Sequence, residues 1–384
     1  MAPKRSDAEV EKWLVSCRRQ LHREPELAFE EYKTTARISK WLDQFSIRTA
    51  AFPLKTGALA VIGGQRPGPT IALRSDIDAL PITEQTGLPF ASVHPGKMHA
   101  CGHDVHMATM LGAARLLKER EEELSGTVKI IFQPAEENGN GAIEVLKTGL
   151  LDDVQSICGM HIMPSLPTGT IGIRSGPLMA AVDRFIIDIT GIGTHGATPE
   201  KGSDTIVAAT QMVGALQTII SRNTSPLNQA LISVTRLEAG NTWNVMPDRA
   251  QLEGTVRTFS EEVRENIEQK MKRVARHTAL ALGTEAHVRY IRLGPPVVND
   301  PLLSGIATDT AAACGLNVVE PPLTLIGEDF AEYQKKIPGS FFFMGVSGNS
   351  DLHHPDLIVD EQAVLPAARF FTELAGHLLR RLKL

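Results

Sequence analysis

The segment Met98-His99-Ala100-Cys101-Gly102-His103-Asp104-Val105-His106 places a thiol and an imidazole two residues apart. In an extended or turn conformation, the side chains of Cys101 and His103 can face the same point. Thiolate and imidazole are both good ligands for zinc and similar ions. Apolar residues from Asp104 to Glu121 follow helical spacing, so a helix would hold the pair rigidly. Taken alone, the pair is also compatible with a small buried cysteine and a structural histidine.

The length and composition of the chain limit the classes of protein to which it can belong. A chain of 384 residues is too long for one ordinary core, so we expect two domains. Its 42% hydrophobic and 22% charged residues describe a globular protein, and the net charge of −5 includes no long single-sign run that would favour nucleic acid or a membrane surface. Four scattered cysteines, with no signal sequence and no membrane-spanning run, predict a cytoplasmic protein.

The first half of the chain alternates helices with short apolar strands. Periodicity predicts two amphipathic helices within 7–45, broken at Glu24-Pro25. Four strands follow, at Gly57–Gly64, Thr70–Asp76, Thr127–Gln133 and Ser156–Met160. This alternation predicts an α/β catalytic domain, with a central mixed sheet flanked by helices.

The pattern changes after Gly176-Pro177. Strand, helix, strand, strand, helix, strand is the order from Val182 to Arg292, with Ser203 and Ser260 as expected helix caps. That order is the ferredoxin-like α+β arrangement β-α-β-β-α-β. We therefore expect an inserted lid or dimerisation domain at 181–293, and a catalytic domain made of 1–180 and 294–384.

Further metal-ligand types lie at the ends of predicted strands. Glu136 and Glu137 follow one strand, and His161 ends the next. The segment Leu352-His353-His354-Pro355, after the apolar run 341–346, offers one more imidazole. Neighbouring side chains of an extended chain point in opposite directions, so one glutamate would bind metal and the other would act as general base. Each residue alone is also compatible with a solvated carboxylate or a polar strand end. Together they supply sulfur, nitrogen and carboxylate donors in one domain.

Ordered motifs extend over nearly the whole chain. They are Leu21–Leu27, Arg74–Pro81, Met98–His106, Phe132–Glu137, Gly159–His161, Gly193–Ala197, Asn244–Asp248, Gly254–Arg257, Gly327–Phe330 and His353–Pro355. In this series the chain resembles the M20 family of metallopeptidases, specifically the amidohydrolase branch that cleaves N-acyl amino acids. That branch includes hippurate hydrolases, aminoacylases and auxin-conjugate hydrolases.

The resemblance implies a site for two divalent metal ions per subunit, which could be zinc, manganese, cobalt or nickel. The implied ligands are Cys101, His103, Glu137, His161 and His353. Cys101 would take the bridging place that an aspartate fills in the peptidase branches. Glu136 would be the general base for a water activated by the two ions.

The resemblance also assigns residues of the inserted domain. His195 matches the family's donor to the tetrahedral oxyanion, and in the family it reaches the partner's active site within a dimer. Asn244 and Arg257 match contacts to the substrate's carboxylate, for which a guanidinium gives two-point recognition. We therefore expect a homodimer or a higher oligomer. The sequence departs from the family's pattern at two places. Thr194 stands where the family often has glycine, and Asn138 and Asn140 interrupt a run that is usually glycine.

The other histidines of the motifs have lesser expected roles. His99, His106 and His354 are predicted to be structural or to support the ligands, and Asp76 to orient a histidine.

The expected function is hydrolysis of the amide bond of a small N-acyl amino acid. One alternative is a dipeptidase or carboxypeptidase, since the same site can cleave other amides beside a free carboxylate. Another is a catalytically silent ligand-binding protein, against which an intact Glu136 argues because such a protein has no use for a general base.

Overall fold

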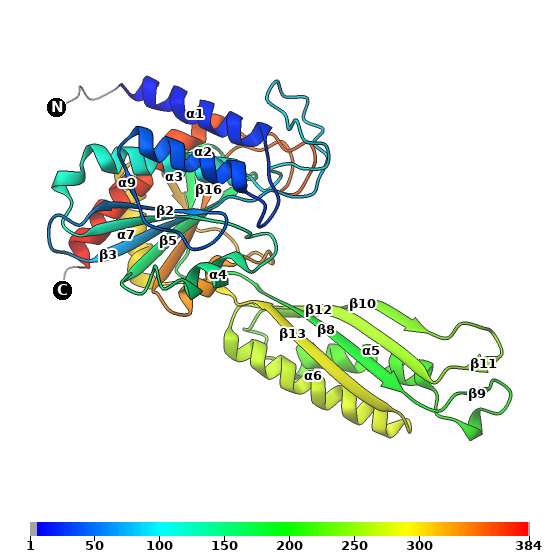
Figure 1. Ribbon diagram of the computed structural model, residues 1–384. Coiled ribbons are helices and arrows are strands. Elements are labelled where there is room, and N and C mark those ends of the chain that lie inside the picture. Colours follow the sequence, from blue (N-terminus) through cyan, green and yellow to red (C-terminus); the bar gives the residue numbers. More distant parts are fainter. Residues whose placement is uncertain (1–5, 383–384) are drawn as a thin grey trace. The chain divides into compact units, whose positions relative to one another are not determined.

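The computed structural model describes residues 6–382, which form two compact units (Figure 1). The first unit contains residues up to Gly176, then Val298–Pro322 and the chain from Asp329 onward. The second unit is Pro177–Val297, together with the short segment Leu323–Glu328. The chain passes between the units within strands β7 (Gly176–Met179) and β14 (Val297–Asn299), and again on either side of Leu323–Glu328.

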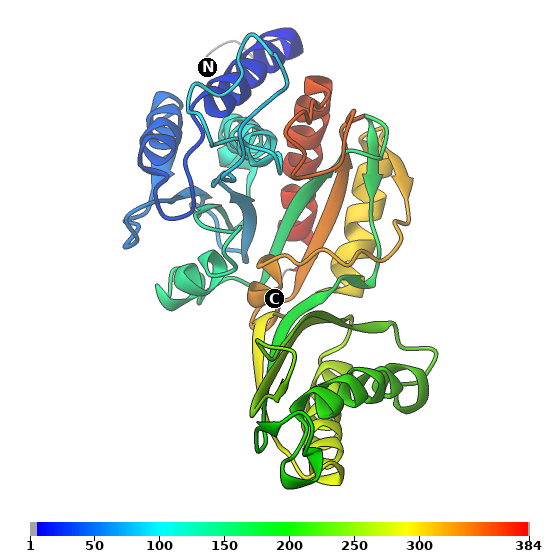
Figure 2. The same ribbon diagram turned by 90° about the vertical axis from the view of Figure 1, so that its right-hand side faces the viewer.

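A mixed sheet forms the centre of the first unit (Figures 1 and 2). In sheet order its strands are β1 (Arg48–Thr49), β2 (Ala58–Gly63), β4 (Thr127–Gln133), β3 (Thr70–Asp76), β5 (Ser156–Met163), β16 (Gly339–Gly345), β6 (Thr170–Gly172) and β15 (Asn317–Val319). The neighbours β4, β3, β5 and β16 run parallel. Their carboxyl ends therefore meet at one edge of the sheet, where α/β proteins place their ligands.

Helices cover this sheet because its strands are apolar on both faces. β3, β5 and β16 are buried almost throughout, as expected for strands inside an α/β layer. The helices of the unit are α1 (Asp7–Arg23), α2 (Tyr32–Gln44), α3 (His103–Glu119), α4 (Gly141–Lys147), α7 (Pro301–Ala313), α8 (Phe330–Gln334) and α9 (Val364–Arg381). α3 packs against α9 and α1, so the segment that begins with Cys101 is anchored in the core.

The second unit has the predicted β-α-β-β-α-β order. Its elements are β8 (Ala181–Thr190), α5 (Thr205–Asn223), β10 (Ala230–Ala239), β12 (Arg249–Thr258), α6 (Glu261–Ala281) and β13 (Glu285–Gly294). The antiparallel sheet has the order β10-β12-β8-β13, and both helices share one core with it. A short ribbon of β9 (Thr194–His195) and β11 (Val245–Met246) completes the unit. The fold class predicted from the sequence is confirmed.

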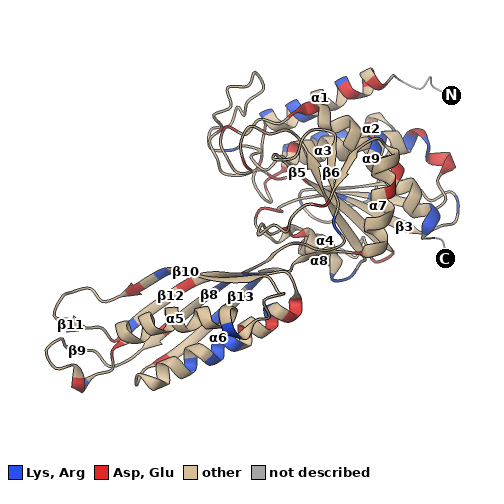
Figure 3. Cartoon of the chain, turned by 180° about the vertical axis from the view of Figure 1, so that it is seen from behind, with Lys and Arg blue, Asp and Glu red and all other residues tan. Residues whose placement is uncertain are grey.

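Charged residues are distributed differently on the two helices of the second unit. Figure 3 shows acidic and basic residues interspersed along α6, whereas α5 is nearly uncharged. Among the helices of residues 6–382, none is both long and apolar enough to cross a membrane.

Two local expectations were wrong. β5 continues to Met163, so His161 lies inside this strand rather than at its end, because the apolar pattern continues through Ile162 and Met163. Helix α5 is capped by Asp204 and not by Ser203. The Asp204 carboxylate accepts hydrogen bonds from the backbone N–H groups of Ile206 and Val207, while the Ser203 hydroxyl accepts one from Ile192.

Candidate metal centre

The donor residues of the first unit converge at the carboxyl edge of its parallel strands. Cys101 lies in the turn that leads into α3, His103 is the first residue of that helix, and Gly102 between them has φ +78°. A side chain at Gly102 would also bring a Cβ within 2.2 Å of the Ile162 side chain. Glycine is therefore required here for both conformation and space. The turn brings the thiol and the first imidazole to the same side, as the sequence predicted.

The thiol of Cys101 lies between two imidazoles. Its Sγ is 3.2 Å from Nε2 of His161 and 3.2 Å from Nε2 of His353. Cys101 and His161 are buried, whereas the side chain of His353 is 51% exposed. His353 has φ +64°, and its backbone N–H is bonded to the carbonyl of Ala100, which holds its loop against the cysteine segment.

Hydrogen bonds donated by Nδ1 orient the buried imidazoles of His161 and His103. Nδ1 of His161 lies 2.7 Å from the carbonyl oxygen of Ile162, and Nδ1 of His103 lies 2.9 Å from that of Asp78. A carbonyl only accepts, so each Nδ1 carries a proton and donates it. In the neutral ring this leaves Nε2 with a free lone pair, which is the arrangement of a metal-binding histidine.

Glu137 faces the same point from the turn after β4. Its Oε1 lies 3.8 Å from Nε2 of His103 and 3.7 Å from Nε2 of His353. Oε1 of Glu137 and Nε2 of His103 are both buried without a hydrogen-bond partner among the described residues. Buried polar atoms without partners are costly, so a cation between them would satisfy both. The donor set therefore fits a divalent metal ion.

Glu136 joins the cluster by a route that the sequence did not predict. The premise of an extended Glu136-Glu137 pair was wrong, because residues 136–139 form a turn and Gly139 donates to the carbonyl of Glu136. The ligand atoms of Glu136, Glu137 and His103 consequently lie within 4.8 Å of one another. Both carboxylates thus face the same metal-binding region.

Burial dominates the electrostatics of the cluster. It raises the pKa of the Cys101 thiol well above its ordinary value and lowers that of His161 to about 3. Burial and the charge of Asp78 raise the pKa of Glu137 to about 7, against the opposing effect of His103. For His103, burial opposes protonation, but the charge of Asp76 and the bond to Asp78 raise its pKa. Burial thus favours the neutral forms of Cys101, Glu137 and His161, and a bound cation would stabilise the thiolate and the carboxylate.

A carboxylate pair behind the cluster supports it. Asp76 lies 2.6 Å from Nδ1 of His106, whose Nε2 accepts the N–H of Ile162, so it orients His106 as the sequence indicated. Asp78 was not assigned a role from the sequence. It supports His103 and also accepts the backbone N–H of Glu137 at 3.0 Å. The sequence feature that could have identified Asp78 is its position two residues after Asp76, just beyond the end of the same strand.

Two other histidines lie outside this set. His99 is buried, with a pKa lowered to about 4 by burial, and His354 is exposed and paired with Asp356. Neither belongs to a group of close metal-ligand atoms among the described residues.

The second unit brings two of its predicted residues together. His195 pairs with Val245 across the β9–β11 ribbon, and the N–H of Gly196 donates to the carbonyl of Asn244. Arg257 lies on β12, half-buried, and donates to the carbonyls of Leu325 and Val256. Burial lowers its pKa. Within residues 6–382 its guanidinium forms no ion pair with a carboxylate, which leaves its charge available for an anionic group.

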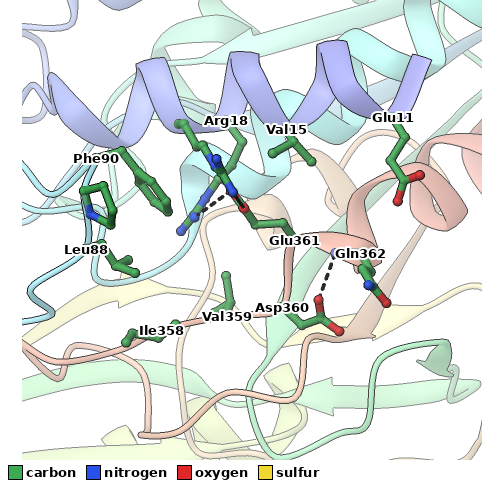
Figure 4. A pocket seen from close by; sticks show the side chains of 12 residues that line it. Glu11, Val15, Arg18, Leu88, Phe90, Ile358, Val359, Asp360, Glu361 and Gln362 are labelled. Atoms are coloured by element: carbon green, nitrogen blue, oxygen red, sulfur yellow. Dashed lines mark hydrogen bonds and ion pairs between the residues drawn. The ribbon is translucent and has the colours of Figure 1, made fainter. Parts of the chain in front are cut away.

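A separate hollow of about 550 Å³ lies between α1 and residues 358–362 (Figure 4). Arg18 and Arg19 line it, and both are paired with Glu361. Arg18 is bonded to Asp104 as well. Because both cations are already neutralised by carboxylates, this hollow offers no charge for an anionic substrate, and the metal-ligand cluster lies elsewhere.

Comparisons with known proteins agree with this geometry. The sequence profile of peptidase family M20/M25/M40 matches residues 72–377. An N-acetylcysteine deacetylase of Bacillus subtilis (strain 168) is 49% identical over 371 residues, which cover 96% of this chain and 98% of that protein. Thermostable carboxypeptidase 1 of Saccharolobus solfataricus is 36% identical over 349 residues, 88% of this chain and 86% of that protein.

A solved structure has the same fold. The crystal structure of the Bacillus subtilis YXEP protein, described as a dinuclear metal-binding peptidase from the M20 family, matches with a TM-score of 0.90 and 46% identity. The match covers 97% of this chain and 99% of that one.

Metal binding should release protons. In the metal-free site the pKa of the Cys101 thiol is raised well above its ordinary value, so the thiol holds a proton that a divalent cation must displace. Glu137, with a pKa of about 7, holds a second such proton below that pH. Apparent zinc affinity should therefore rise with pH between 6 and 8, by about tenfold per pH unit for each displaced proton. Calorimetric titration in buffers of different ionisation enthalpy measures this release.

Two cysteine variants control that measurement. Cys101→Ala should release at least one proton fewer. Cys158→Ala, which removes a thiol buried elsewhere in the unit with a pKa of about 12, should leave the release unchanged. Equal proton release from the wild type and Cys101→Ala would exclude this thiol as a ligand.

Proposed function

Because the chain belongs to peptidase family M20/M25/M40 and is a metal-dependent amidohydrolase, we propose that it hydrolyses N-acyl amino acids to a carboxylic acid and a free amino acid. The family predicted from the sequence is confirmed. The observation that carries the proposal is the buried cluster of ligand atoms around Cys101, with a second carboxylate beside it. The similarity to an N-acetylcysteine deacetylase over nearly the whole chain supports an N-acyl substrate.

We propose that five residues of the first unit hold two divalent ions, which could be zinc, manganese, cobalt or nickel. The ligands are Cys101, His103, Glu137, His161 and His353. The position of Sγ of Cys101, 3.2 Å from an imidazole nitrogen on either side, supports a bridging role for the thiolate. When bound, the ions would polarise the scissile carbonyl and increase the acidity of the attacking water.

Glu136 is the proposed general base. Its carboxylate faces the cluster beside Glu137, and burial is incomplete there, so water can reach it. The carboxylate accepts a proton from the attacking water and then delivers it to the departing amine nitrogen. Asp78 supports this step by holding the backbone of Glu137 and the ring of His103.

Residues of the second unit are proposed to recognise the substrate. Arg257 would bind the free carboxylate of the amino acid, because its cation is not neutralised by a carboxylate of the described chain. Asn244 would contribute an amide to the same recognition. His195 would donate to the developing oxyanion, which needs a donor in a dry site.

We also propose a homodimer in which His195 reaches the partner's site. The sheet of the second unit ends on strands β10 and β13, whose free edges can pair across a two-fold axis. A solution mass equal to one chain, 41.7 kDa, would contradict the dimer. The four cysteines are all free, which favours a reducing compartment, and we propose the cytoplasm.

The alternative that a specific observation favours is a carboxypeptidase. A thermostable carboxypeptidase is 36% identical, and recognition of a free carboxylate beside the scissile amide would serve either reaction. A ligand-binding protein without catalysis has no use for Glu136.

A substrate panel decides between these functions. The zinc- or manganese-loaded chain should hydrolyse N-acetyl and N-benzoyl amino acids with at least tenfold higher kcat/KM than dipeptides or the corresponding N-acyl amino acid amides. The metal-free chain should be inactive. Release of free amine from each substrate measures the rates. Preference for dipeptides would favour the carboxypeptidase, and activity without metal, verified by elemental analysis, would overturn the proposal.

Two glutamine variants test the division of roles between the neighbouring glutamates. Glu136→Gln keeps the shape but removes the base, so kcat should fall by about 10²-fold or more with metal content retained. Glu137→Gln should lose metal, because a neutral amide is a poorer ligand than a carboxylate. Elemental analysis and initial rates measure both effects. If both variants lose metal equally, the assigned roles are wrong.

A further inference from the structure

The peptide that leads into Glu136 is held in an unusual conformation. Ala135 has φ +56°, in the left-handed region that residues with a Cβ rarely adopt. It is fully buried, so its backbone N–H and C=O both need partners inside the protein. The direction of this peptide sets where the next two side chains point.

Glu31 supplies the partner for the Ala135 N–H. Its Oε1 accepts that hydrogen bond at 2.8 Å, from a residue 104 positions earlier in the chain. Glu31 is itself fully buried at the start of α2. A buried glutamate is uncommon unless it has a specific partner. This one is outside the metal-ligand groups of the described residues.

The other side of the same peptide is held as well. The N–H of Gly141 donates to the Ala135 carbonyl at 3.1 Å. A side chain at Gly141 would place its Cβ 1.8 Å from the Pro134 carbonyl oxygen, so only glycine allows this approach. Glu31 and Gly141 therefore hold both the N–H and the C=O of Ala135.

Glu31 sits on a rigid support. Glu26 accepts the backbone N–H groups of Lys33 and Thr34 at 3.2 and 2.8 Å, which fixes the first turn of α2 directly after Glu31. Thr35 in the same turn accepts the N–H of Gly57 at 2.8 Å. The helix start that carries Glu31 is thus tied to the Glu26 carboxylate and to the loop before β2.

We propose that Glu31 is a positioning residue that fixes the Ala135 peptide and thereby aims the Glu136 and Glu137 carboxylates at the metal-binding region. The effect that we expect on turnover rests on the proposed function. The contribution of Glu31 lies in its reach and its acceptor oxygen, and it does not require a negative charge.

Two substitutions separate reach from charge. Glu31→Gln keeps the length and an oxygen that accepts from Ala135, but removes the charge. Glu31→Asp keeps the charge but withdraws the carboxylate by about 1.5 Å, beyond hydrogen-bond distance of the Ala135 N–H. In the metal-loaded chain with N-acetyl-L-cysteine, Glu31→Asp should lower kcat at least tenfold with KM changed less than threefold. Glu31→Gln should stay within threefold of wild type.

Two further measurements do not depend on turnover. Zinc affinity should fall about tenfold or more in Glu31→Asp, because residues that orient ligands have effects of this size. Hydrogen exchange of the peptide spanning 133–142 should accelerate in Glu31→Asp and remain near wild type in Glu31→Gln. Melting temperatures of all variants establish that they are folded.

Glu121→Asp is the matched control. Glu121 also accepts a backbone N–H, that of Gly63 at 3.0 Å, in the same unit. Its shortening should leave exchange at 133–142, zinc affinity and kcat unchanged.

The outcomes are distinct. Wild-type exchange and zinc affinity in Glu31→Asp would overturn the proposal, as would equal impairment of Glu31→Gln, which would make charge the cause. If Glu121→Asp accelerates hydrogen exchange at 133–142 as much as Glu31→Asp does, the effect is a general loosening of the unit. That result would also overturn the proposal. If the wild-type chain hydrolyses no N-acyl amino acid, the proposed function fails, while exchange and zinc affinity still decide the role of Glu31.

Discussion

The metal centre depends on hydrogen bonds to the far side of its imidazoles. The Ile162 carbonyl and the Asp78 residue hold the Nδ1 atoms of His161 and His103, so both Nε2 atoms must face Cys101 and Glu137. A ring that rotated away would leave buried nitrogen atoms without partners, at a cost of about 1–3 kcal/mol each. The carbonyls belong to the ends of β5 and to the segment after β3, so the parallel sheet itself fixes the direction of the ligands.

A second constraint acts on the carboxylates. Alanine in the left-handed region is disfavoured by about 1–2 kcal/mol, so the turn at Ala135 persists only because the surroundings determine it. Hydrogen bonds from Ala135 to Glu31, from Gly141 to Ala135, and from Glu137 to Asp78 supply that determination. Two segments far apart in the sequence, around Glu31 and around Asp78, thus converge on one turn. Asp78 belongs to both sides of the centre, because its carbonyl holds the ring of His103 and its carboxylate holds the backbone N–H of Glu137.

Much of this arrangement could be predicted from the sequence, and the reasons for the remainder are physical. The alternation of helices with apolar strands predicted the fold class. The position of ligand-type residues at the ends of predicted strands in one domain indicated that residues such as Cys101 and Glu137 come together. The Glu136-Glu137 turn was not foreseen, because a positive φ at alanine leaves no signature in composition or periodicity. Glu31 has a backbone N–H as its partner, and no sequence pattern identifies such a partner. His161 was placed at the end of its strand because periodicity does not determine strand boundaries.

The most direct test of the metal centre is X-ray absorption at the zinc edge of the zinc-loaded chain. Ligation by Cys101 predicts a sulfur scatterer at about 2.3 Å, nitrogen and oxygen at about 2.0–2.2 Å, and a second zinc at about 3.5–4 Å. The sulfur signal should vanish in Cys101→Ala and persist in Cys158→Ala. Two bound zinc ions per chain with only nitrogen and oxygen neighbours would contradict the central claim that the buried thiolate joins the two ions.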